Sequence, residues 1–125
     1  MEPIKKVNQK QRGNRFERTI TNKFKKLGYE NAATSRLMSK HMDNLGIDIV
    51  GIPYIVQCKY GKQRGINYSQ VIKSISDNVK NIKELNKLPI LVFHTTNARQ
   101  EHDKLVIMQE KDLWNIIELI TTLKT

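Results

Sequence analysis

Residues 46–59 read GIDIVGIPYIVQCK, and this stretch decides the predicted fold. Two apolar and partly β-branched runs, 47–51 and 54–60, flank a short turn that contains Pro53. Such runs around a proline turn are typical of a β-hairpin. We therefore expect the two runs to pair as antiparallel strands about a turn centred on residues 52–53.

This hairpin would bring three polar side chains together in an apolar setting. The turn places Asp48 across from Gln57, and Gln57 and Lys59 point to one face because side chains alternate along a strand. Val56 and Cys58 then point to the other face, toward a core covered by a helix. A lone carboxylate in an apolar strand is costly to bury unless it is paired or bound to a metal. A salt bridge between Asp48 and Lys59, or an exposed edge position, is the structural alternative.

The rest of the chain predicts helices and further strands around the hairpin. In chain order the predicted elements are a helix over 12–27, a short strand over 31–37, a loop over 39–46, the hairpin strands over 47–51 and 54–60, a loop over 61–67, a helix over 69–86, strands over 90–93 and 104–108 with a loop over 95–103 between them, and a final amphipathic helix carrying Leu113, Ile116, Ile117 and Ile120. This order (αβββαββα) predicts an α/β fold in which helices flank a mixed sheet.

The length of 125 residues suits one domain with a sizeable core. Residues 1–11 are basic and polar and are predicted to be a disordered arm, and 12–125 a single domain. A single cysteine excludes an internal disulfide and indicates a reducing compartment. No apolar run approaches the roughly 18 residues of a membrane span, and no secretory signal precedes the domain. The sequence thus predicts a soluble, cytoplasmic or other intracellular protein.

The charge is strongly skewed, with 22 Lys and Arg against 12 Asp and Glu and a formal net charge of +10. A polyanionic partner such as DNA explains this excess, because cationic side chains neutralise phosphates and release condensed counterions. A basic protein with no such partner is the alternative. Five basic residues flank the polar hairpin in sequence and are the candidates for contacts to a DNA backbone: Arg12, Arg15, Arg18, Lys62 and Arg64.

The polar residues of the hairpin match the preferences of Mg²⁺, which takes oxygen ligands and keeps several waters. Asp48 would supply a charged oxygen, the Gln57 side-chain carbonyl a second and the backbone carbonyl of Cys58 a third. Lys59 would then lie beside the attacking water or the phosphate and stabilise developing charge. Cys58 itself is interpreted as a small core residue and not as a nucleophile.

One carboxylate gives Mg²⁺ only one charged ligand, so a second acid is expected nearby. Glu17 is the preferred candidate because it lies on the shoulder of the first helix's apolar stripe, next to Phe16 and three residues before Ile20. An exposed glutamate paired with a neighbouring arginine is the alternative. Asp43 is a weaker rival, placed in the predicted loop over 39–46.

The hairpin resembles the PD-(D/E)xK nuclease superfamily, which has the restriction-endonuclease-like fold. Residues 46–48 stand for its first motif element and 57–59 for its second, and 56–59 (VQCK) look like the Mrr-type variant in which Gln replaces the acid. Residues 12–18 (RGNRFER) resemble the start of archaeal and phage Holliday junction resolvases, in which the glutamate of the first helix belongs to the active site.

The resemblance implies an endonuclease dependent on Mg²⁺, with Mn²⁺ able to substitute, that acts as a homodimer in DNA recombination and repair. It would nick opposing strands of a four-way DNA junction, and it suits a phage-encoded protein. The implied site comprises Glu17, acting on the metal through a water, with Asp48, Gln57 and Lys59. The implied DNA-contacting loop carries Arg36 and Lys40, for which a plain solvated loop is the alternative.

The sequence departs from the resolvase pattern at Gln57, which removes a negative charge from the implied metal site. Two other functions therefore stay open: an Mrr-like nuclease that cuts duplex DNA, and a basic DNA-binding module whose site has decayed. The three histidines lack zinc-type spacing and are interpreted as non-catalytic. Trp114, on the final helix, is expected in a core or an interface and not on a base-stacking platform.

Overall fold

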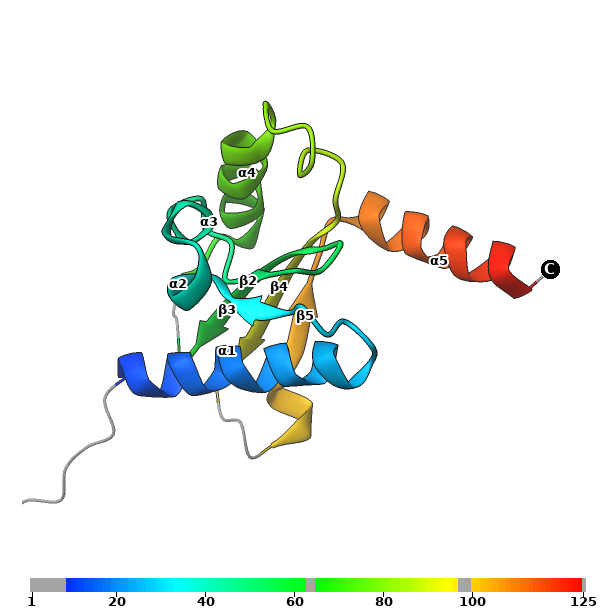
Figure 1. Cartoon of the computed structure of the whole chain (residues 1–125). Helices are drawn as coiled ribbons and strands as arrows, with labels where there is room; N and C mark the ends of the chain where they lie inside the picture. Colours follow the sequence, from blue (N-terminus) through cyan, green and yellow to red (C-terminus); the bar gives the residue numbers. More distant parts are fainter. Residues whose placement is uncertain (1–8, 63–64, 97–99, 125) are drawn as a thin grey trace, which may run out of the picture.

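The computed structural model of the chain describes residues 9–62, 65–96 and 100–124. Its elements (Figure 1) are α1 (Gln9–Lys26), β1 (Ala33–Thr34), α2 (Ser35–Met38), α3 (Lys40–Asn44), β2 (Ile49–Val50), β3 (Ile55–Tyr60), α4 (Tyr68–Val79), β4 (Ile90–Thr95), a 3-10 turn (Glu101–Asp103), β5 (Leu105–Ile107) and α5 (Glu110–Lys124). The five strands form one sheet in the order β1-β2-β3-β4-β5. β3 and β4 pair in parallel and the other neighbours pair antiparallel, so the α/β class with a mixed sheet is confirmed.

The β2–β3 hairpin has the predicted register. Ile49 lies opposite Val56, which is the pairing that a turn centred on residues 52–53 gives. Gly51 is required within this turn, because its φ is +80° and a Cβ there would lie 2.1 Å from the backbone oxygen of Asn31. The chain can therefore pass close to the segment before β1 only with a glycine at this position.

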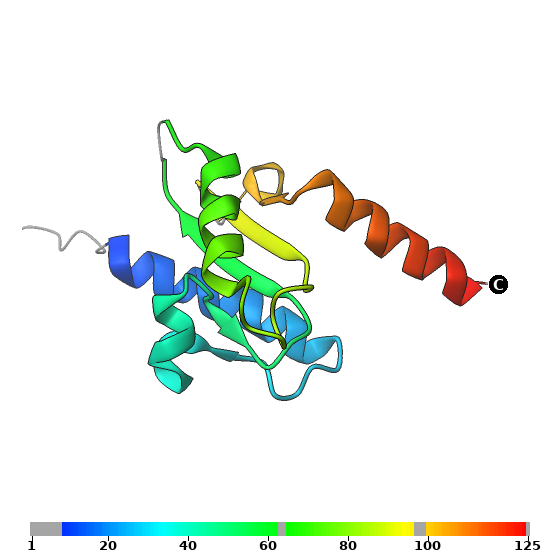
Figure 2. The ribbon, with the colours of Figure 1, turned by 90° about the horizontal axis from the view of Figure 1, so that it is seen from above.

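Helices cover the two faces of the sheet (Figures 1 and 2). On the α1 face the buried cluster contains Phe16, Ile20, Ile49, Val56 and Leu91, and Cys58 packs against it as predicted. On the α4 face the cluster contains Ile47, Ile55, Ile72, Ile75, Val79, Ile90 and Val92. The alternation of β3 thus places Val56 and Cys58 under α1, and leaves Gln57 and Lys59 on the α4 side.

The segment between β1 and β2 differs from the prediction. The strand expected over 31–37 is reduced to two residues, and the loop expected over 39–46 contains a helix. Ser35 begins the short helix α2 and donates its hydroxyl to the carbonyl of Ile47. Ser39 caps α3, since its side chain accepts a hydrogen bond from the backbone N–H of Met42. These serine contacts stabilise turns too short for hydrophobic periodicity to reveal.

Three boundaries also differ from the prediction. α1 begins at Gln9, so the prediction that residues 9–11 are disordered is wrong. Residues 1–8 of the predicted arm lie outside the described part of the chain. α4 ends at Val79 instead of residue 86, and hydrogen-bonded turns follow it. β4 ends at Thr95 instead of residue 93, so the loop predicted over 95–103 begins later; it contains the 3-10 turn, and its residues 97–99 lie outside the described part.

α5 leaves the body of the molecule immediately after β5 and projects away from the sheet (Figure 1). Its first turn is anchored because the buried carboxylate of Asp112 accepts a hydrogen bond from the backbone N–H of Ile90, at 3.2 Å. Trp114 is 56% exposed, so it does not lie in a core. In the part of the chain that the structure describes, none of the helices has the length and apolar character needed to cross a bilayer.

Replacing Gly51 with Ala should test how strongly the hairpin turn depends on glycine. We expect Gly51→Ala to lower the free energy of unfolding by about 3 kcal/mol, because it adds a steric clash to an unfavourable positive φ. Gly65→Ala is the matched control: its φ is +76° but no atom lies within 4 Å of its Cβ position, so about 1 kcal/mol is expected. Chemical denaturation measures both, and equal losses would contradict the close approach at Asn31.

Candidate functional site

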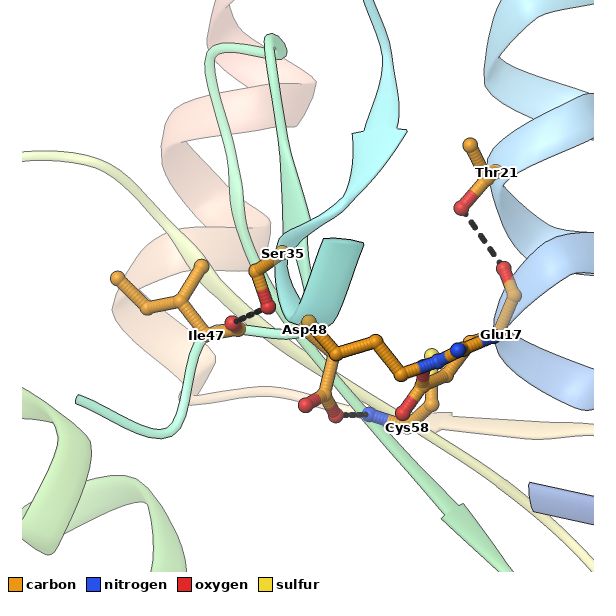
Figure 3. A network of polar contacts seen from close by, with 7 residues as sticks. Glu17, Thr21, Ser35, Ile47, Asp48 and Cys58 are labelled. Carbon is orange, nitrogen blue, oxygen red and sulfur yellow. Dashed lines mark hydrogen bonds and ion pairs between the residues drawn. The ribbon is translucent and has the colours of Figure 1, made fainter. Parts of the chain in front are cut away.

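Asp48 is held in place by three hydrogen bonds at the entrance to β2. Its carboxylate Oδ2 accepts from the backbone N–H of Cys58 at 2.7 Å. Its backbone N–H donates to the carbonyl of Val56 at 2.7 Å, and its carbonyl accepts from the N–H of Ser35 at 2.8 Å. Figure 3 shows the carboxylate directed at the Cys58 nitrogen. The hairpin and α2 therefore fix both the backbone and the side chain of this residue.

Burial raises the pKa of Asp48 to about 7. The hydrogen bond from Cys58 opposes this shift, the charges of Glu17 and Asp43 add to it, and the charge of Lys59 reduces it. A carboxylate with this pKa is divided between its charged and neutral forms near neutral pH. Such a group in a polar cluster is a candidate functional group.

Glu17 reaches from α1 toward the hairpin that carries Asp48 (Figure 3). Its Oε2 accepts from Nε of Arg36, on α2, at 3.2 Å. Burial raises the pKa of Glu17, while the hydrogen bond and the charge of Arg36 act in the opposite direction and the charge of Asp43 adds to the rise. The structure thus places Glu17 close enough to influence Asp48 and pairs it with an arginine at the same time.

Gln57 and Lys59 line a cavity of about 640 Å³ on the α4 side of the sheet, together with Asp43. The Gln57 amide Nε2 donates to the carbonyl of Gly46 at 3.2 Å. Its Oε1 is buried and has no hydrogen-bond partner within the described structure. A buried oxygen without a donor is costly, and it offers an acceptor or a ligand to whatever enters the cavity.

Asp43, which was the weaker candidate for the second acid of the site, lies close enough to raise the pKa of both Glu17 and Asp48. Three acids therefore share the site with Arg36 and Lys59. Arg36 is the arginine partner that the sequence suggested for Glu17 only as an alternative and without naming it, and the role of Ser35 in holding Asp48 was not predicted. The signal that would have indicated the latter is a serine placed where a short strand gives way to a helical turn.

The described candidates for DNA contact are distributed over α1, α2, α3 and the segment after β3. Arg12, Arg15 and Lys62 line a separate groove on the α1 side of the sheet. Arg18 and Lys40 are exposed on α1 and α3. Arg36 is the partner of Glu17, and the predicted contact Arg64 lies outside the described residues.

Glu17, Asp43 and Asp48 influence one another but are not gathered closely enough to form a preformed metal site within the described residues. Among residues 9–62, 65–96 and 100–124, no three His, Cys, Asp or Glu side chains gather closely enough to hold a metal ion. A ligand set would have to draw on the Gln57 amide and backbone carbonyls. Cys58 is a poor ligand, because burial, helped by the charges of Asp48 and Glu17, raises the pKa of its thiol far above neutral.

His94 belongs to a hydrogen-bond network that is separate from Glu17, Asp43 and Asp48. Its Nδ1 is hydrogen-bonded to the hydroxyl of Tyr68, and its Nε2 lies 2.9 Å from the carbonyl of Gly61. His94 is also paired with Lys59 in the parallel register of β3 and β4. This network ties the chain after β3 to the first turn of α4.

Comparison of the chain with protein-family models, with curated proteins and with solved structures found no match.

The pKa of Asp48 predicts a specific pH dependence of stability. Because the folded pKa is raised from 3.8 to about 7, the folded state binds the proton more tightly than the unfolded state between these values. The free energy of unfolding therefore falls as pH rises through this window, by at most about 4 kcal/mol from this group. Asp48→Asn should remove the fall and stabilise the protein at pH 8 relative to wild type.

Chemical denaturation at pH 5 and pH 8 tests this dependence. Asp77→Asn is the matched control, because Asp77 is exposed on α4 and pairs with Lys73. This control should not stabilise the protein at pH 8. A wild type and an Asp48→Asn variant with the same pH dependence would show that Asp48 ionises normally in the folded chain.

Proposed function

We propose that this protein is a metal-dependent endonuclease of the PD-(D/E)xK type that acts as a Holliday junction resolvase. The observation that carries the proposal is the convergence of Glu17 and Asp48, whose charges influence each other, at a hairpin that also carries Lys59. The succession of α1, β1–β3, α4, β4–β5 and α5 supports the restriction-endonuclease-like fold, with α2 and α3 as insertions between the first two strands.

The residues present fit a hard divalent cation. The orphaned Oε1 of Gln57 is the kind of oxygen that Mg²⁺ or Mn²⁺ takes as a ligand. The set that would hold the ion is Asp48, Gln57 and the Cys58 carbonyl, with Glu17 acting through a water. When bound, the ion would polarise the scissile phosphate and lower the pKa of the attacking water. A cation would also offset the mutual repulsion of Glu17, Asp43 and Asp48.

Side chains of the protein would supply the other roles that phosphodiester cleavage requires. Asp48 is fixed by the Cys58 N–H and needs no reorganisation to present its free oxygen. Lys59 lies on the same face of β3 as Gln57 and lines the same cavity, so its ammonium can stabilise negative charge on the phosphate. Arg36 forms an ion pair with Glu17 in the structure. This ion pair would have to break before Glu17 could interact with the metal ion.

The substrate class follows from charge and symmetry. A net charge of +10 on 125 residues favours a polyanion, and the exposed Arg18 and Lys40 lie on the two helices that carry Glu17 and Asp43. A homodimer would present two equivalent sites related by a twofold axis, which suits paired cuts in opposing strands of a four-way junction.

A decayed DNA-binding module is the second candidate. It is favoured by Gln57 in place of an acid and by the lack of a three-acid metal cluster within the described residues. This candidate predicts binding to DNA without cleavage in Mg²⁺ or Mn²⁺, so the same experiment separates the two.

The decisive experiment offers equal amounts of labelled four-way junction, linear duplex and single strand in the presence of Mg²⁺. We expect paired symmetric nicks in the junction, whereas indiscriminate cutting of the duplex would indicate an Mrr-like enzyme. Asp48→Asn, Glu17→Gln and Lys59→Ala should each reduce the rate by at least about 100-fold and leave junction binding within a few-fold. Asp77→Asn and Lys73→Ala, on the exposed face of α4, are matched controls that should cut normally. A site variant that cuts at the wild-type rate would remove that residue from the site.

Gln57→Glu tests the metal site without measuring cleavage. A carboxylate at this position adds a charged oxygen ligand, so we expect the apparent affinity for Mg²⁺ to rise about tenfold. The readout is the midpoint of thermal unfolding as a function of Mg²⁺ concentration, since a ligand stabilises the folded state it binds. Gln109→Glu adds the same charge before α5 and should leave the Mg²⁺ dependence unchanged. An equal response in both variants would mean that Gln57 does not touch the ion.

A further inference from the structure

The cavity on the α4 side of the sheet is a cleft between α3 and α4, and the proposed cleavage chemistry uses only part of its lining. β3 contributes Gln57 and Lys59, and α3 contributes Asn44 opposite α4 (Figure 1). At the last turn of α4 the amide of Asn78 joins the two walls, because it donates to the carbonyl of Leu45 at 3.1 Å. The volume of about 640 Å³ is in the range of small-molecule sites.

α4 lines this α3–α4 cleft with a row of uncharged hydrogen-bonding side chains. Gln70, Ser74 and Asn78 stand four residues apart, so they lie along one face of the helix over about 12 Å. Another exposed row of the same helix is charged, since Lys73 and Asp77 form an ion pair there at 2.8 Å. The helix therefore separates its amide and hydroxyl groups from its charged groups by face.

The lining of the cleft is rich in amides and nearly neutral. Among the described residues that line it, six Asn, Gln or Ser side chains stand beside one cation, Lys59, and one acid, Asp43. The separate groove on the α1 side is lined by five Lys or Arg. Cationic side chains bind phosphates, whereas an amide presents a donor beside an acceptor and contacts the edge of a base. The cleft is therefore suited to a base and not to a run of phosphates.

The first turn of α4 lies at the same end of the cleft as Lys59. Tyr68, which begins α4, is hydrogen-bonded to His94, and His94 is hydrogen-bonded to the carbonyl of Gly61 just after β3. These contacts hold the start of α4, with Gln70, beside the end of β3. A nucleotide has its base one sugar away from its phosphate. A phosphate at Lys59 would therefore have its base within reach of Gln70.

We propose that the α3–α4 cleft holds an unpaired adenine of the bound DNA strand, next to the scissile phosphate. The choice of DNA as the ligand rests on the proposed nuclease function. The amides stand on facing walls, so a base has to enter from an unpaired or opened stretch of strand. Asn44 and Gln70 are exposed, which leaves their amides accessible to such a base.

Adenine fits this lining better than guanine does. The exocyclic amino group and N7 of adenine match the acceptor and the donor of one Asn or Gln amide, whereas guanine is contacted most often by Arg or Lys. Lys59 is the one cation among the described lining residues, and the proposed function assigns it to the phosphate. A free adenine nucleotide offers the same base, but a strand adds neighbouring phosphates that a chain of net charge +10 attracts.

Binding of short single strands in EDTA tests this site without cleavage. The reference strand contains thymidine alone, and three others carry one central adenine, guanine or cytosine. We expect the wild type to bind the adenine strand about tenfold more tightly than the other three, as measured by fluorescence anisotropy. Gln70→Ala and Asn44→Ala should each reduce this preference by about threefold or more. Both should leave the salt dependence of binding unchanged, because an amide releases no counterion.

Ser76→Ala is the matched control, because Ser76 is exposed on α4 and points away from the row of Gln70 and Ser74. It should keep the full preference for adenine, and an equal loss in Ser76→Ala and Gln70→Ala would contradict the site. Alanine favours helix, so circular dichroism should show an intact α4 in both variants.

The outcomes separate the adenine site from the nuclease proposal. A wild type that binds none of the strands, binds all four equally or binds guanine most tightly would overturn the adenine site, while cleavage of the junction would still support the nuclease. A protein that prefers adenine and does not cut would support the adenine site alone. Free dAMP should displace the strand only at millimolar concentration, and displacement at micromolar concentration would assign the cleft to a free nucleotide and overturn the proposal.

Discussion

The hydrogen bond from the Cys58 backbone N–H to the Asp48 carboxylate joins the fold to the candidate site. It depends on the register of β2 against β3, because a shift of one residue would turn Gln57 and Lys59 toward α1 and Val56 toward α4. The same register places Ile49 in the α1 cluster and Ile55 in the α4 cluster. The packing of both helices and the position of the acid are therefore set by one strand pairing.

Three acids and two basic side chains act on one another at the candidate site. Burial raises the pKa of Glu17 and Asp48, and the charge that opposes this rise comes from Arg36 for Glu17 and from Lys59 for Asp48. Arg36 and a metal ion would serve the same electrostatic purpose for Glu17 from different directions. In the proposed nuclease a metal ion would thus replace Arg36 as the cation beside Glu17. This replacement would affect α2, because α2 carries Arg36.

Much of the core architecture follows from patterns visible in the sequence. The apolar runs and the proline turn predict the hairpin and its register, and the position of Glu17 on the shoulder of a stripe predicts that α1 carries it to the site. The short helices α2 and α3 could not be predicted, because four or five residues hold less than two turns of periodicity. The pairing of Arg36 with Glu17 links α1 to α2 and depends on tertiary packing alone. The stripe of α5 is equally visible in the sequence, but periodicity does not tell whether a chain buries a stripe against itself.

The parallel pairing of β3 with β4 has a consequence for how the molecule forms. β2 and β3 are joined by a short turn, whereas β3 and β4 are joined by the whole crossover that contains α4. Closing the longer loop has the larger entropic penalty, so non-local pairing of this kind slows folding. Asp48 and its Cys58 donor belong to the local hairpin, while the cavity around Gln57 and Lys59 also needs α4. The carboxylate is therefore expected to be positioned early in folding, and the cavity it would share with a substrate is expected to be completed only when the crossover closes.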